Sequence, residues 1–155
     1  MIVTAEEFAR IRRQAEAEYP NECCGVILVG DGPGAERTLL PCRNIQNELH
    51  ARDPVRYPRD ARTAYNISLD DFRRIDELES EGFRIRTFYH SHVDAEAYFS
   101  ETDKRHAAPP PRGEPLYPDA IYLVLAVFDR QARDARAFRW DSGQGDFLPV
   151  SFEAP

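Results

Sequence analysis

Four polar residues in the middle of the chain have the types and spacing of a catalytic metal site. His90 and His92 flank one serine, and Ser100 and Asp103 follow in the pattern H-x-H-x(7)-S-x(2)-D. Side chains of a β-strand alternate between its faces, so two histidines separated by one residue point to the same side and can bind one ion. A carboxylate such as that of Asp103 would complete a three-ligand catalytic zinc site, leaving the fourth position for water. Zinc in such a site lowers the pKa of water from about 15.7 to about 7 and polarises a carbonyl group.

Each part of this pattern also has a purely structural interpretation. Ser100 and Asp103 match a capping box, in which a serine begins a short helix and an acidic residue follows at the third helical position. Two histidines on a strand can be ordinary surface residues. The two interpretations are compatible, because Ser100 can begin the helix while its hydroxyl faces the metal. The combination of all four residues at one spacing favours the metal site.

Length and composition predict one globular domain over residues 1–155. Hydrophobic residues make up 42% of the chain and charged residues 30%, which is typical of globular proteins. The net charge of −7 argues against nucleic acid as the main ligand, because phosphate binding needs a basic face. No apolar run is long enough to cross a membrane, and the charged N-terminal stretch is unlike a signal peptide. We therefore expect a cytoplasmic protein that binds neither nucleic acid nor a membrane.

The cysteines predict no disulfide framework. Cys23, Cys24 and Cys42 are odd in number, two of them are adjacent, and no C-x-x-C pair occurs. Because Cys23 and Cys24 open a strongly apolar segment, we expect them to pack as small hydrophobic side chains.

Helices are expected in three places. Residues 5–18 form an amphipathic pattern after a capping box that begins at Thr4. A second capping-box pattern begins at Ser68 and leads into a helix that should end at Gly82. The third helix should be short, because a run of three prolines follows the segment that begins at Ser100.

Strand-like segments alternate with these helices. They are CCGVILVG, RTLLPC, FRIRTFYHSH, PDAIYLVLAVFD, ARAFRWD and DFLPVSF, of which the first two should form a hairpin. In FRIRTFYHSH, strict alternation would place Ile85 and Tyr89 on the face opposite His90. The polar residues 43–65 are expected to form a long loop or a broken strand. This loop and the proline-rich AAPPPRGEPLYPD segment should flank the site, where they could bind an extended tail.

The complete pattern resembles the JAMM motif of the MPN-domain metalloproteases. All spacings of the His-Ser-His, serine and aspartate motif agree, and the segment PNECCGVILVG places Glu22 where the family has a glutamate near its first strand. One departure is Val93, where many members have proline. The resemblance extends over roughly residues 2–140. It implies an MPN-like α/β fold, similar to cytidine deaminase, with a mixed, mostly antiparallel sheet flanked by helices.

The resemblance also implies a function and a role for each site residue. Members are zinc peptidases or isopeptidases, and the stretch AYFSETD is most similar to bacterial members acting on ubiquitin-like sulfur carriers or small conjugates. The substrate would be an amide bond at the C-terminal Gly-Gly tail of such a protein. By this resemblance, His90, His92 and Asp103 bind Zn²⁺. Glu22 acts as general base towards the zinc-bound water and protonates the leaving amine, and Ser100 donates a hydrogen bond to the oxyanion or the water.

Several alternatives stay open at this point. A non-catalytic MPN-type interaction module ranks lower because such modules usually lack part of the metal set. A deaminase ranks lowest because its H-x-E and P-C-x-x-C signatures are absent. The ligand types do not exclude iron or manganese, and a homodimer is only the common default. We expect His106 to be an ordinary surface histidine, although it could support the metal site from one helical turn away.

Overall fold

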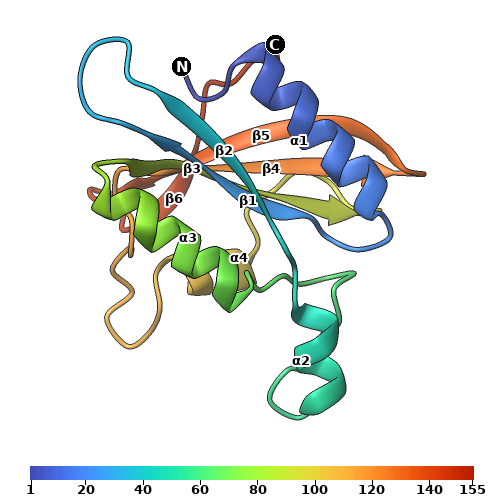
Figure 1. The fold of residues 1–155 in the computed structure, drawn as a ribbon. Coiled ribbons are helices and arrows are strands. Elements are labelled where there is room, and N and C mark those ends of the chain that lie inside the picture. Colours follow the sequence, from blue (N-terminus) through green and yellow to red (C-terminus); the bar gives the residue numbers. More distant parts are fainter.

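The computed structural model describes residues 1–155 and is built around one six-stranded mixed sheet (Figure 1). The strand order is β2-β1-β3-β4-β5-β6. Only β3 and β4 run parallel, and a crossover containing a helix joins them, as parallel neighbours require. The bounds are β1 Cys24–Val29, β2 Arg37–Cys42, β3 Arg84–Val93, β4 Ile121–Phe128, β5 Gln131–Asp141 and β6 Asp146–Val150. The predicted α/β fold with a mixed, mostly antiparallel sheet is confirmed.

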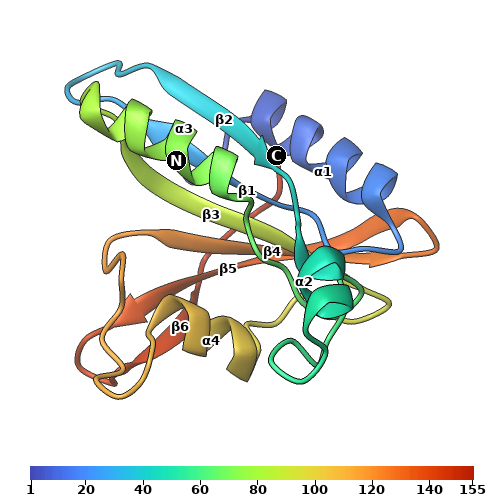
Figure 2. The same cartoon turned by 60° about the horizontal axis from the view of Figure 1, so that its bottom comes forward.

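Helices cover both faces of this sheet (Figures 1 and 2). The helix α1 lies on one face, and α3 and α4 lie on the other. The bounds are α1 Ala5–Glu18, α2 Gln46–Arg52, α3 Leu69–Ser80 and α4 Glu101–Ala107. The predicted first helix and its capping box at Thr4 are confirmed, because the Thr4 hydroxyl accepts from the backbone of Glu7 and the Glu7 carboxylate accepts from that of Thr4. No helix is both long and apolar enough to span a bilayer.

The strand β1 is buried on both faces, which explains its unbroken apolar sequence. Ile27 packs on the side of α1, while Val26 packs on the side of α3. All three cysteines are free, and Cys23 and Cys24 are buried, as predicted. Cys42 is buried as well. Gly25 is required for close packing, because a Cβ atom there would overlap the Tyr89 hydroxyl and lie 2.6 Å from the carbonyl oxygen of Leu40.

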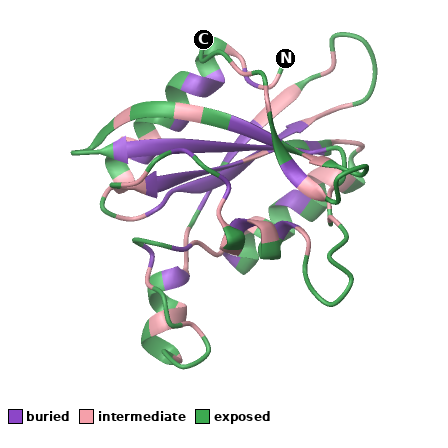
Figure 3. Ribbon diagram, turned by 180° about the vertical axis from the view of Figure 1, so that it is seen from behind, coloured by how far each residue is buried: buried purple, intermediate pink, exposed green.

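Residues 43–65 are not the continuous loop or broken strand that their composition predicts. Within them Gln46–Arg52 form α2, which projects from one end of the molecule and is largely exposed (Figure 3). This helix has no apolar stripe, and its only buried residue is Gln46. The Gln46 side chain donates to the carbonyl oxygen of Arg59 at 2.6 Å and accepts from Asn66 at 2.6 Å. The helix therefore depends on contacts with the segment after it, which no periodic pattern reveals.

A β-bulge in β3 corrects the expected alternation. Ile27 pairs with Thr87 and Leu28 pairs with Ile85, so Arg86 is an extra residue opposite β1. Ile85 consequently packs with Leu28 on the side of α3 and not on the side of α1. The bulge precedes the histidine end of the strand and leaves the alternation there intact.

The start of α3 differs in one detail from a capping box. The Ser68 hydroxyl accepts from the backbone N–H of Asp71 at 3.2 Å, as an N-cap does. The Ser68 backbone N–H donates to the carbonyl of Arg43, so the reciprocal bond is missing. The helix ends at Ser80, and Gly82 follows with φ 98°.

Candidate metal centre

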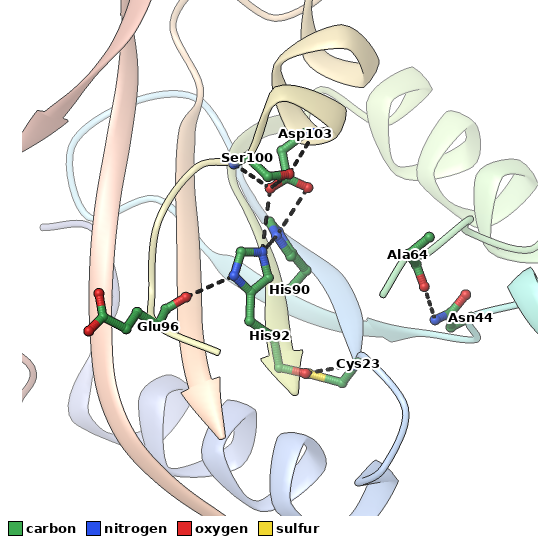
Figure 4. Close-up of polar contacts among 9 residues, drawn as sticks. Cys23, Asn44, Ala64, His90, His92, Glu96, Ser100 and Asp103 are labelled. Carbon is green, nitrogen blue, oxygen red and sulfur yellow. Dashed lines mark hydrogen bonds and ion pairs between the residues drawn. The ribbon is translucent and has the colours of Figure 1, made fainter. Parts of the chain in front are cut away.

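The side chains of His90, His92 and Asp103 converge where the carboxyl end of β3 meets the start of α4 (Figure 4). The two Nε2 atoms lie 3.3 Å apart. Nε2 of His90 is 3.3 Å from Oδ1 of Asp103, and Nε2 of His92 is 3.5 Å from Oδ2. All three residues are buried. Ser91 points to the opposite face, and its hydroxyl accepts a hydrogen bond of 2.8 Å from the backbone N–H of Cys23.

These distances suit one tetrahedral metal ion. Zn–N bonds of about 2.0–2.1 Å at a tetrahedral angle put two ligand nitrogens about 3.3 Å apart, which is the separation of the histidine nitrogens. One ligand atom from each of the three residues lies within 4.8 Å of the others. Imidazole nitrogen with carboxylate oxygen is a donor set for Zn²⁺ and for other first-row divalent ions. The triad could therefore hold a metal ion, and its identity does not follow from the geometry.

A hydrogen bond at Nδ1 orients the ring of His92. Its Nδ1 lies 2.8 Å from the carbonyl oxygen of Glu96. Because a carbonyl oxygen only accepts, Nδ1 carries a hydrogen, and in the neutral ring this leaves Nε2, which faces the triad, free to bind a metal ion. The ring of His90 stacks on Tyr65 with centroids 4.8 Å apart. Both imidazoles are thus fixed in the direction that metal binding requires.

Asp103 is held by the predicted capping box of α4. The Ser100 hydroxyl accepts from the backbone N–H of Asp103 at 3.1 Å and donates to Asp103 Oδ2 at 2.6 Å. The Ser100 backbone N–H also donates to Oδ2, at 2.8 Å. Burial raises the pKa of Asp103, but His90, His92 and Ser100 together lower it more and hold it well below its usual range. The carboxylate is therefore ionised and aimed at the histidines.

Glu22 lies beside the triad in space, although it is far from it in the sequence. It precedes β1, its side chain is buried, and it lines a cavity of about 130 Å³ together with His92, Ser100 and Asp103. Its backbone N–H donates to the carbonyl of Ala61 at 2.7 Å. Burial and then the charge of Asp103 raise the pKa of Glu22 to about 9. No local pattern marks this residue, and only the family resemblance pointed to it.

Sequence reasoning missed other side chains around this cavity. Arg59 and Arg62, from the segment after α2, line it, and so does Tyr98, which packs edge-on against His92. His106 is exposed, as expected, and stands between this cavity and a second one of about 370 Å³. The second cavity is mainly apolar and includes residues of the proline-rich segment, namely Pro109, Leu116 and Tyr117. Both segments expected to flank the site therefore do so.

Two curated relatives align with almost the whole chain. The CysO-cysteine peptidase of Mycobacterium tuberculosis is 24% identical over 151 residues, which cover 97% of this chain and 90% of that protein. The desampylase of Haloferax volcanii is 28% identical over 142 residues, which cover 92% of this chain and 86% of that protein.

Solved structures share the fold at low identity. A protein from Salinibacter ruber has a TM-score of 0.62 at 23% identity, covering 100% of this chain and 92% of its own. A JAB1/MPN domain protein from Archaeoglobus fulgidus has a TM-score of 0.50 at 13% identity, covering 99% and 97%. The family model described as prokaryotic homologs of the JAB domain matches residues 4–141, and the chain therefore belongs to this family.

Proposed function

We propose that this MPN-type domain is a zinc-dependent peptidase or isopeptidase that hydrolyses an amide bond at the C-terminus of a ubiquitin-like or sulfur-carrier protein. The observation that carries the proposal is the buried triad of His90, His92 and Asp103 beside the buried carboxyl of Glu22. Family membership and relatives named CysO-cysteine peptidase and desampylase support the substrate class.

Each side chain then has one task in the reaction. His90, His92 and Asp103 would hold the ion, which supplies Lewis acidity by lowering the pKa of water from about 15.7 to about 7 and polarising a carbonyl group. Glu22 lines the same cavity, and the positive charge of a bound ion would lower its pKa from the value of about 9 that it has without the ion. Its carboxylate form is then placed to accept a proton from water and to deliver it to the leaving amine. The amide C–N bond breaks, the carrier keeps the carboxylate, and the amine leaves with the proton.

For Ser100 we propose a hydrogen bond to the developing oxyanion or to the attacking water. Its hydroxyl donates to Asp103 Oδ2 in the structure, so this role requires the hydroxyl hydrogen to turn away from the carboxylate. The backbone N–H of Ser100 would still hold Oδ2 during that turn. Removing one oxyanion donor in other hydrolases costs about 10²–10³ in rate, which sets the size of the expected effect.

The proposal is tested with a ubiquitin-like sulfur carrier that has extra residues after its terminal Gly-Gly. The carrier is incubated with the zinc-loaded protein, and intact-mass analysis follows the products, with chelator and Glu22→Gln as controls. Release of the Gly-Gly carrier only with metal and with Glu22 supports the peptidase. If one zinc binds per chain and no tested carrier is cleaved, the non-catalytic interaction module becomes the better proposal.

A further inference from the structure

Two arginines with no carboxylate partner line the cavity that holds Glu22. Arg59 and Arg62 are both exposed, and neither takes part in any of the ion pairs of the protein. Most exposed arginines face bulk water, but these two share a small cavity with the proposed reaction centre. Their guanidinium groups are therefore available to a substrate.

The segment that contains the two arginines is hydrogen-bonded to the backbone of Glu22. Ala61 lies between the two arginines, and its carbonyl oxygen accepts a hydrogen bond of 2.7 Å from the backbone N–H of Glu22. The backbone N–H of Ala61 donates to Asn47 Oδ1 at 2.8 Å. The Gln46 side chain donates to the carbonyl of Arg59 at 2.6 Å. The backbone of this segment is thus fixed relative to the proposed base, which is the arrangement a binding site needs.

Asn44 also connects this segment to the backbone of Glu22. Its side-chain amide donates to the carbonyl oxygen of Glu22 at 2.9 Å and to that of Ala64 at 3.2 Å. Asn44 lies two residues after the end of β2. The loop with the arginines and the residue that would protonate the leaving amine therefore form one connected unit.

The chemistry of the leaving group suggests what the arginines bind. A guanidinium group pairs with a carboxylate through two parallel hydrogen bonds. When the leaving group is a single amino acid, its free carboxylate lies only two bonds from the amine nitrogen that Glu22 would protonate. When the leaving group is a lysine side chain of a protein, no free carboxylate lies near that nitrogen.

We propose that Arg59 and Arg62 bind the α-carboxylate of a single amino acid, so that the preferred substrate is a carrier–amino acid adduct and not an isopeptide with a protein. This inference rests on the proposed function. The ionised Asp103 lines the same cavity, and the two cations would offset its repulsion of a substrate carboxylate. Hydrolysis returns the carrier with its carboxylate and the amino acid with its amine, and no further reactant is required.

Two other roles for the arginines make different predictions. Arg59 lowers the pKa of Glu22, against the larger effects of burial and Asp103, and could act only through that carboxyl. Both arginines could instead attract an acidic surface of the carrier. If either of these roles applies, replacing an arginine changes kcat/KM by the same factor for leaving groups with and without a carboxylate. If the arginines bind the carboxylate, the replacement changes the ratio of the two kcat/KM values.

The test uses a ubiquitin-like sulfur carrier ending in Gly-Gly with one added alanine, as the free acid and as the C-terminal amide. With zinc-loaded protein we expect kcat/KM to be about tenfold or more higher for the acid, the size of a charge-assisted hydrogen bond. Arg59→Gln and Arg62→Gln should each bring the acid-to-amide ratio towards one. Arg10→Gln, an exposed arginine of α1, makes the same change in charge on the other face of the sheet and should keep the ratio. Equal kcat/KM for both forms, or an unchanged ratio in both cavity variants, overturns the proposal.

A binding measurement separates this proposal from the peptidase activity itself. The peptides acetyl-Gly-Gly-Ala acid and acetyl-Gly-Gly-Ala amide are titrated by NMR into zinc-loaded Glu22→Gln protein, alone and combined with Arg59→Gln or Arg62→Gln. Tighter binding of the acid that disappears with either arginine supports the site, even if no carrier is cleaved. Equal binding of both peptides, or no binding of the acid, rejects the site even if carriers are cleaved.

Discussion

Replacing Glu22 with glutamine removes the proposed proton acceptor and keeps the size of the side chain. Because general bases contribute about 10²–10⁴ to a rate, we expect kcat/KM on a carrier substrate to fall by that factor. Zinc content should stay at one ion per chain, because the triad of His90, His92 and Asp103 is complete without Glu22. Loss of turnover with full zinc content would assign Glu22 to the reaction and not to the metal.

The same substitution should stabilise the metal-free protein at neutral pH. Burial and Asp103 raise the pKa of Glu22 from 4.5 to about 9, so the folded state keeps a proton that the unfolded state releases. The free energy of unfolding therefore falls as pH rises from about 4.5 towards about 9. From pH 4.5 to pH 7, a span of about 2.5 pH units, the free energy of unfolding falls by about 1.4 kcal/mol per unit, or by up to about 3 kcal/mol in total. Glutamine does not titrate and avoids this loss.

Denaturant unfolding in the presence of chelator, at pH 5 and at pH 8, measures this effect. The stability advantage of Glu22→Gln over the natural protein should be small at pH 5 and larger at pH 8. Glu153→Gln, at an exposed position near the C-terminus, is the matched control and should show no such trend. A difference that is the same at both pH values would refute the raised pKa, and activity equal to that of the natural protein would refute the role as base.

Three further substitutions test the site and its support. Asp103→Asn should lose zinc on dialysis, because the charged ligand is gone, and full zinc content measured by atomic absorption would exclude Asp103 as a ligand. Gly25→Ala should lower the free energy of unfolding by about 1–3 kcal/mol, since its methyl group would overlap Tyr89, and unchanged denaturant unfolding would contradict that packing. Ser91→Ala should cost about 1–3 kcal/mol in the same assay, because the buried N–H of Cys23 loses its acceptor.

The parts of the site that the sequence predicted lie within single elements. His90 and His92 share a face because strand alternation is local, and Ser100 and Asp103 meet because a helix turn is local. Asp103 on α4 meets the histidines of β3 only because of the path that the chain takes between the parallel strands β3 and β4. The periodicity of the sequence does not define that path. The position of Glu22 depends on the pairing of β1 with β3, so only the family resemblance could indicate it.

The features that the sequence did not predict depend on contacts between distant segments. The helix α2 forms although its residues have no apolar period, because Gln46 is buried against Arg59 and Asn66. The bulge at Arg86 is a property of the pairing between two strands and leaves no mark in the composition of either. The same holds for the cavity position of Arg62, since polar loop residues reveal their neighbours only in the folded chain.

The capping and metal interpretations of Ser100 and Asp103 turn out to describe one arrangement. The backbone N–H and the hydroxyl of Ser100 both donate to Oδ2 of Asp103, while Oδ1 lies 3.3 Å from His90 Nε2. The bonds that start α4 therefore fix the plane and direction of the carboxylate before any ion binds. A ligand held in this way loses little conformational freedom on metal binding, so the helix start lowers the entropic cost of forming the centre. This explains why a common capping motif is compatible with the proposed metal-binding role at this position.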